Sequence, residues 1–348
     1  MIRFGGFLLD YDNTLPDSTN PSFLAKKRKE SLLAGTFTHW MVVEEALRQC
    51  NEQPGKHPQS FPAIFSQKHF VSLGAVSPDY PYLTDLLNKW FKTHSWADRM
   101  HYENTGAFVQ HGMERLLSLS GDTFSVCQAW LAGYASHVIT DSVIHPVVQA
   151  IVGPYIFNST EHRHCEMVQD AFIFHDIKGQ EISYTALDGT DYCSMLKKCS
   201  DPEDPEKIHP DLCQLWSETL KACHPGAGPY FDRIVPDKWH ENFISRIEGA
   251  ADPICICRNF EEKENIAYKK TPDISSDEWE RFYGVVRLPG NKTGGFKQDV
   301  FEKAVDAVIS TWDKFLSDVE KKIPVGCAEY LKNWNLDTGV DEDRPHFW

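Results

Sequence analysis

The sequence predicts a mainly α-helical protein, and three observations support this. Apolar residues in segment 298–322 recur at three- and four-residue steps, as in a helix with one face in the core. Segment 130–146 is apolar apart from regularly spaced His and Asp residues and a few small hydroxyl residues, which is typical of a buried helix. Similar helical patterns recur along the chain without repeats or low-complexity tracts. With 348 residues and 41% hydrophobic content, the chain can bury a large core.

The N-terminal half begins with a short apolar run and a polar, proline-containing stretch, together covering residues 1–30. The first expected helix, over residues 37–50, carries an apolar face. A loop rich in Asn, Pro and Gly follows at 51–60, and then an aromatic segment. Further helices are predicted at about 83–93, 103–119, 124–145 and 160–173.

The stretch 188–210 is polar and rich in turn residues, and it is the best candidate for a boundary. We therefore expect residues 1–190 to form a helical domain that carries the metal cluster considered below. Residues 191–348 would form a helical region that packs on this domain as part of the same globule. Its helices are predicted at about 211–222, 237–249, 276–285 and 298–322.

The charge balance is acidic, because 35 basic residues face 50 acidic ones and the net charge is −15. Such a chain disfavours non-specific binding to nucleic acid or to an anionic membrane, so we expect no nucleic-acid partner. The N-terminal apolar run is too short for a secretion signal, and no stretch reaches the roughly 18 apolar residues of a membrane span. We therefore expect a cytoplasmic protein without a transmembrane segment, whose cysteines are reduced thiols.

Three potential metal ligands lie in the apolar segment 130–146. His137, Asp141 and His145 are spaced by four residues, so a helix places them within about 80° of arc on one stripe. Burying two imidazoles and a carboxylate is costly unless they are paired or bind a metal. A hydrogen-bonded His–Asp pair would explain two such residues, whereas three on one stripe favour a metal site.

Other residues of the same chemical types flank this segment. Imidazole and carboxylate ligands without thiolate suit a catalytic zinc ion with open coordination positions, although iron or manganese would also accept them. The ten cysteines include no CxxC pair, which a structural zinc site would more often use. The flanking candidates are His39, Asp79, His94, His101, His162 and Glu166.

Taken in order, these residues resemble the zinc-dependent phospholipase C family, which is related to P1-type nucleases and to the catalytic domain of glycosylphosphatidylinositol phospholipase D. The resemblance spans roughly residues 31–175. It implies a multi-helix bundle of the phospholipase C/P1 nuclease type with the metal site in its helical core. It also implies a zinc-dependent phosphodiesterase. The matching pieces are His39, the turn 77–80, the stretch 101–105, the segment 133–146 and the pair His162/Glu166.

The resemblance also implies how the ligands divide. Asp79, either His94 or His101, His137 and Asp141 would hold one ion, and His145, His162 and Glu166 a second. His39, with Asp141 as a bridge, could hold a third, so two or three zinc ions are expected. Asp79 is also the candidate general base. The choice between His94 and His101 stays open, because His94 has the better spacing from Asp79 and His101 the better surrounding motif.

Two features depart from the family pattern. Secreted relatives complete the third site with the amino group of an N-terminal tryptophan, whereas His39 lies well inside this chain. The second His of the central motif follows the Asp by four residues here, as in the phospholipase D-like branch, and by six in phospholipase C. The first departure puts the third ion in doubt.

Three functions are therefore compatible with the sequence. The first is zinc-dependent hydrolysis of a phosphoester or phospholipid-like small molecule by activated water. The second is oxidative chemistry at an iron or manganese pair on the same scaffold, although the ExxH pairs of di-iron bundles are missing. The third is a non-catalytic protein with a structural metal.

Overall fold

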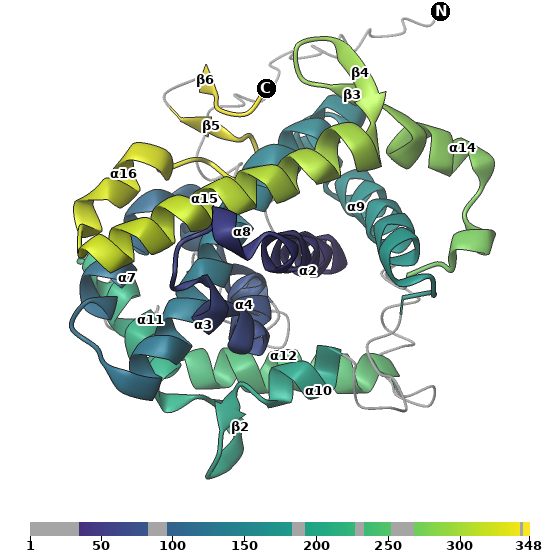
Figure 1. Ribbon diagram of the computed structural model, residues 1–348. Helices are drawn as coiled ribbons and strands as arrows, with labels where there is room; N and C mark the ends of the chain where they lie inside the picture. The colour runs from purple at the N-terminus through teal and green to yellow at the C-terminus, as the bar shows by residue number, and fades with distance from the viewer. Residues whose placement is uncertain (1–34, 83–95, 183–191, 227–232, 252–267, 342–343) are drawn as a thin grey trace, which may run out of the picture.

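A computed structural model describes residues 35–82, 96–182, 192–226, 233–251, 268–341 and 344–348 (Figure 1). Within these ranges the protein is built of helices, and its strands form three short antiparallel pairs. The prediction of a mainly α-helical protein is therefore confirmed. The helix predicted at 83–93 and the candidate ligand His94 lie outside the described residues.

The helices correspond closely to the periodic segments of the sequence. Those of the first half are α2 (Thr36–Glu52), α3 (Phe61–Ser66), α4 (Lys68–Gly74), α6 (Trp96–Tyr102), α7 (Thr105–Leu116), α8 (Gly121–Val152) and α9 (Tyr155–Lys178). Those of the second half are α10 (Tyr192–Lys197), α11 (Pro210–Cys223), α12 (Pro236–Ala251), α14 (Ser276–Trp279), α15 (Glu302–Lys321) and α16 (Cys327–Tyr330). Short 3₁₀ turns connect several of them, including η2 (Ser77–Asp79).

Helix α8 is the central element of the core. Its side chains are buried on every side from Val126 to Ile144, as its apolar sequence predicts. It packs against α2, α4, α7, α9, α11 and α15, and Figure 1 shows α15 crossing over it beside α2. No helix in the described part of the chain combines the length and apolar character that crossing a bilayer requires.

Helix α8 continues past the point where the sequence suggested that it ends. The prediction ended at about residue 145, just before Pro146, which lacks the N–H that would bond to the carbonyl of Ser142. In the structure the helix extends to Val152, with Pro146 and the two residues after it buried. Packing of this stretch therefore outweighs the loss of one backbone hydrogen bond.

Helices α4 and α8 touch backbone to backbone through two glycines. A Cβ atom on Gly133 would lie 2.0 Å from the Val71 carbonyl oxygen, and one on Gly74 would lie 2.1 Å from that of Trp130. Only glycine permits this approach. It brings the end of α4 and the turn η2 against α8, where the Trp130 indole N–H donates to the Ser77 hydroxyl at 2.9 Å.

The predicted helix over 276–285 was too long. Helix α14 ends at Trp279, a π-helical turn covers Glu280–Gly284, and strand β3 (Val285–Leu288) pairs with β4 (Lys292–Gly295). Side chains in β3 are alternately exposed and buried, and the turn that follows has positive φ at Gly290 and Asn291, which suits a hairpin. The other pairs are β1 (Ser200–Asp201) with β2 (Asp204–Ile208) and β5 (Val340–Asp341) with β6 (Arg344–Pro345).

One buried apolar cluster includes residues from both sides of the turn-rich stretch 188–210. Trp216 of α11 and Trp312 of α15 belong to the same buried cluster as Trp130 of α8. The Trp312 indole N–H also donates to the carbonyl of Ala132 at 2.9 Å. The C-terminal half thus packs directly on the helix that carries the central His–Asp–His motif.

Candidate metal centre

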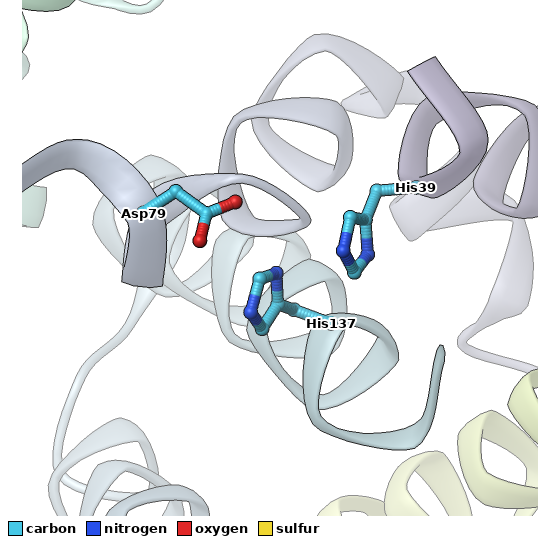
Figure 2. Close-up of side chains that lie close together, drawn as sticks. All are labelled: His39, Asp79 and His137. Atoms are coloured by element: carbon cyan, nitrogen blue, oxygen red, sulfur yellow. The ribbon is translucent and has the colours of Figure 1, made fainter. Parts of the chain in front are cut away.

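Eight of the nine candidate ligands come together in the core, and the ninth, His94, lies outside the described residues. They reach the site from five elements, so the cluster exists only in the folded chain. Figure 2 shows three of them, His39, Asp79 and His137, pointing toward a shared space from α2, η2 and α8. The eight are His39 on α2, Asp79 on η2, His101 on α6, His137, Asp141 and His145 on α8, and His162 and Glu166 on α9.

The first group consists of Asp79, His101, His137 and Asp141. His101 Nε2 lies 3.2 Å from His137 Nε2 and 3.2 Å from Asp79 Oδ1. Asp141 Oδ2 lies 3.1 Å from His137 Nε2 and 3.7 Å from His101 Nε2. Three of these four side chains are at least 95% buried, and Asp79 is 13% exposed. The ligand atoms of His101, His137 and Asp141 therefore lie within 4.8 Å of one another inside the protein, and Asp79 joins them through His101.

Backbone carbonyls fix the orientation of two imidazoles in this group. His137 Nδ1 lies 2.8 Å from the Ala75 oxygen, just after the end of α4. His101 Nδ1 lies 2.7 Å from the Ala97 oxygen in the preceding turn of α6. A nitrogen this close to a carbonyl oxygen must carry the proton, so each neutral ring presents an unprotonated Nε2. When both rings are neutral, as metal binding requires, the two Nε2 lone pairs face each other across 3.2 Å.

The second group consists of His145, His162 and Glu166. Glu166 Oε1 lies 3.1 Å from His145 Nε2 and 3.0 Å from His162 Nε2. His162 and Glu166 are one turn apart on α9, which places both on the same face of that helix. His145 Nε2 is also 3.5 Å from Asp141 Oδ1, so the two groups adjoin at Asp141.

His39 contacts the same central carboxylate from the other side. Its Nε2 lies 3.0 Å from Asp141 Oδ1, and its ring stacks on that of His137 with centroids 4.3 Å apart. Asp141 thus offers Oδ2 to the first group and Oδ1 to His39 and His145. This is the position of a bridging ligand.

The start of α2, which carries His39, is held by a side chain of α9. Gly35 precedes the helix and has no side chain to cap it. Asp170 instead accepts the backbone N–H of Thr38 at 2.7 Å and that of Phe37 at 3.3 Å. Burial raises the pKa of Asp170 to about 6, although the hydrogen bonds from Thr38 and Tyr268 oppose this.

The geometry fits a tetrahedral metal site. Ligands about 2.0–2.1 Å from a zinc ion lie roughly 3.3–3.4 Å from one another. Four contacts between ligand atoms of the first group span 3.1–3.7 Å, and the two contacts of Glu166 in the second group are 3.0 and 3.1 Å. A cation between His101 and His137 would also remove the repulsion between their facing lone pairs. The residues present therefore suit two metal ions.

Without metal, the carboxylates of the site favour protonated imidazoles. Burial alone would lower the pKa of His101, but the hydrogen bond and charge of Asp79 outweigh it and raise that pKa to about 9. Burial likewise opposes the charged form of His145, but Asp141 and Glu166 raise its pKa to about 10. Protons thus occupy positions in which a metal would be held.

The carboxylates respond in the opposite direction. Burial would raise the pKa of Glu166, but the positive charge of His162 and the hydrogen bonds of His145 and His162 lower it to about 2. Burial opposes ionisation of Asp141 too, and the surrounding histidines hold its pKa well below the usual range. Both carboxylates therefore stay ionised and available as ligands at neutral pH.

Sequence patterns did not identify every residue that lies near the site. His164 is two residues after His162 on α9, and its Nε2 contacts Glu278 Oε1 at 2.8 Å outside the cluster. Asp170 was missed, although it continues the four-residue spacing of His162 and Glu166 and could have been found from it. Asp337, which lies near His145, was also missed, and no spacing motif indicated it.

A small cavity of about 10 Å³ lies beside the shared carboxylate. Its lining includes Thr38, His39, Asp141, His145 and Glu166. This is room for about one water-sized species. A larger pocket of about 380 Å³ lies between β2, α11 and α12 and contains none of the eight clustered residues.

A comparison with models of known protein families gives a match. A family model described as zinc dependent phospholipase C matches residues 38–225, just over half of the chain. The matched range contains all eight clustered residues. No curated protein sequence and no solved structure matches the chain. The chain belongs to the zinc-dependent phospholipase C family.

Proposed function

We propose that this protein hydrolyses phosphodiesters, with zinc ions held by the eight clustered residues. The observation that carries the proposal is the convergence of His101 and His137 in a buried site, where their Nε2 atoms lie 3.2 Å apart and the Asp141 carboxylate lies 3.1 Å from His137 Nε2. Two buried imidazoles with facing Nε2 atoms need a proton or a metal ion between them, and a metal ion can bind the adjacent carboxylate as well. Family membership supplies the expected metal and the expected class of reaction.

We assign the ligands by proximity. The first group would hold one ion through Asp79, His101, His137 and Asp141, and the second group would hold another. His39 and Asp141 Oδ1, at 3.0 Å, offer two protein atoms beside the small cavity. Because two protein ligands bind a metal less tightly than three or four, we expect two ions of high affinity and a weaker third.

The charge of the site supports an anionic substrate. Three carboxylates belong to the two groups, so two divalent ions would leave a net positive charge of about one. The whole chain carries −15, and the metal centre would therefore supply the local attraction for a phosphate group. Bound zinc ions would polarise the phosphate oxygens and lower the pKa of a water molecule towards neutrality.

The protein side chains would perform the remaining steps. Asp79 is more accessible than Asp141, with 13% against 2% of the side chain exposed, so we propose that it accepts the proton of the attacking water. Asp141 would stay ionised and fix the spacing of the two groups. For the substrate we propose a phospholipid-like phosphodiester, in keeping with the family.

The proposal is tested by metal analysis together with a set of phosphoesters. We expect at least two zinc ions per chain, and hydrolysis of bis(p-nitrophenyl) phosphate and of phosphatidylcholine in mixed micelles. Chelator treatment should abolish both activities, and zinc should restore them. Absence of a bound transition metal, with no activity after zinc is added, would reject the proposal. Full zinc content without turnover would instead indicate a structural metal, and oxygen consumption by an iron-containing form would indicate oxidative chemistry.

Zinc affinity is expected to depend steeply on pH. The raised pKa values of His101, about 9, and His145, about 10, mean that each group binds a proton that zinc must displace at neutral pH. The affinity of each group should therefore rise about tenfold per pH unit between about pH 6.5 and 9. Competition titrations with a chromogenic chelator of known pH dependence measure this. A plateau just above pH 6.5, the ordinary pKa of histidine, would contradict it.

A further inference from the structure

The C-terminal segment, described over residues 331–341 and 344–348, lies against the elements that carry the metal ligands, although it is outside the range matched by the family model. The Leu336 N–H donates to the carbonyl of His101 at 2.9 Å. The Trp348 indole N–H donates to the carbonyl of Val143 at 2.8 Å. The segment thus contacts α6 through its backbone and α8 through the side chain of Trp348.

The segment packs on α8 at its proline. Gly339 has φ of +60°, and a Cβ there would lie 2.4 Å from the Ser142 oxygen and 2.8 Å from the Pro146 ring. Pro146 provides no N–H for that oxygen, so the carbonyl is open to this approach. Glycine is required at 339 both by its φ and by the closeness of α8. The residue two positions earlier, Asp337, is thereby placed beside His145.

His145 lacks the support that the first-group histidines have. Its Nε2 faces Glu166 and Asp141, so its Nδ1 points away from the metal position. This Nδ1 is buried and has no hydrogen-bond partner among the described residues. Asp337 Oδ1 lies 3.8 Å from it, whereas His101 and His137 each have a carbonyl oxygen within 2.8 Å.

Two other side chains hold Asp337 in this place. The Tyr102 hydroxyl donates to Asp337 Oδ2 at 2.9 Å, which leaves Oδ1 directed at His145. The Gln149 amide donates to the Asp337 carbonyl at 2.6 Å, from one turn beyond His145 on α8. The carboxylate is therefore anchored through both its side chain and its backbone.

We propose that Asp337 is a positioning residue of the second group, and that it accepts the Nδ1 proton of His145 when a metal ion is bound. A histidine that binds metal through Nε2 carries its proton on Nδ1, and a carboxylate acceptor fixes the ring and increases the basicity of Nε2. A small rotation of the His145 ring or of the carboxylate would shorten 3.8 Å to a hydrogen bond. The inference rests on the proposed zinc site but not on the substrate.

The test measures zinc affinity and not turnover. In a competition titration, Asp337→Ala should weaken one class of zinc sites about 10- to 100-fold and leave the other unchanged. Asp337→Asn keeps the shape of the side chain and an acceptor oxygen but not the charge, so its zinc affinity should lie between those of the wild type and Asp337→Ala. Asp341→Ala removes a carboxylate from the same segment and serves as the matched control, with both affinities retained. The cobalt(II) spectrum of the Ala variant should also change.

The outcomes separate this inference from the proposed function. If the second group binds zinc equally tightly in the wild type, Asp337→Asn and Asp337→Ala, the inference is overturned, even if the protein hydrolyses phosphodiesters. If Asp337→Asn weakens one class of zinc sites, the result supports a positioning role for Asp337. If the zinc-free form of this variant also melts at the wild-type temperature, loss of folding is excluded as the cause. Loss of both classes together would mean that Asp337 acts on the fold, and would also overturn the inference. A wild type that binds no zinc would instead reject the proposed function.

Discussion

Asp141→Ala should remove zinc binding and lower phosphodiester hydrolysis by about 10³-fold or more. Asp141 Oδ2 contacts His137 at 3.1 Å, and its Oδ1 lies 3.0 Å from His39 and 3.5 Å from His145. Alanine therefore removes a ligand shared by both groups. In the zinc-free protein it also leaves buried imidazoles without their carboxylate, which typically costs about 3–5 kcal/mol. Metal analysis, turnover and thermal melting measure the three effects.

Two control variants test whether the effect of Asp141→Ala depends on its position and not on the loss of any carboxylate or imidazole from these helices. Asp122→Ala removes an exposed carboxylate from the first turn of the same helix and should leave metal content and turnover unchanged. His164→Ala removes an imidazole from α9, where His164 pairs with Glu278 away from the cluster, and should be nearly silent. Full metal content and activity in Asp141→Ala would mean that the central stripe of α8 serves packing alone.

Asp79→Asn should lower turnover by about 10²–10⁴-fold while the protein still folds and binds zinc, if Asp79 is the general base. The amide keeps the size of the side chain and one coordinating oxygen, but it cannot accept a proton at neutral pH. Burial would raise the pKa of Asp79, but His137 and His101 outweigh it and lower that pKa. Asp79 is therefore ionised at neutral pH and able to serve both as a ligand and as a proton acceptor.

A second amide variant distinguishes these two roles. Glu166→Gln alters a carboxylate that contacts His145 and His162 and that we assign to metal binding only. It should weaken zinc binding, and excess zinc should restore much of its rate. If Asp79→Asn is restored in the same way, Asp79 is a ligand and not the base. If Asp79→Asn leaves both zinc affinity and turnover unchanged, the turn Ser77–Asp79 has no role in the chemistry.

The close approach of α4 and α8 explains why the first group depends on residues that bear no metal ligand. Gly74 and Gly133 allow backbone contact between the two helices. That contact places the Ala75 carbonyl 2.8 Å from His137 Nδ1 and brings Asp79 onto the same site. The orientation of His137 is thus set by packing at Gly133, about one turn away on the same helix.

The sequence determined by itself the features that are local to one helix. A regular four-residue spacing fixes the angle between side chains, so His137, Asp141 and His145 had to share a face of α8, as His162 and Glu166 do on α9. Apolar periodicity located most helices for the same reason. It missed the hairpin of β3 and β4, where the pattern changes from helical to alternating within a few residues.

Only the tertiary structure decided which residues meet across the chain. It brought His101 beside His137, it set His39 against Asp141, and it placed Asp337 behind His145. None of these contacts follows from spacing, because each depends on how separate helices cross and on where the C-terminal segment docks. The contacts of His137 and His101 with the carbonyls of Ala75 and Ala97 do not follow from the sequence either. Every residue has a carbonyl, and only packing determines which one an imidazole reaches.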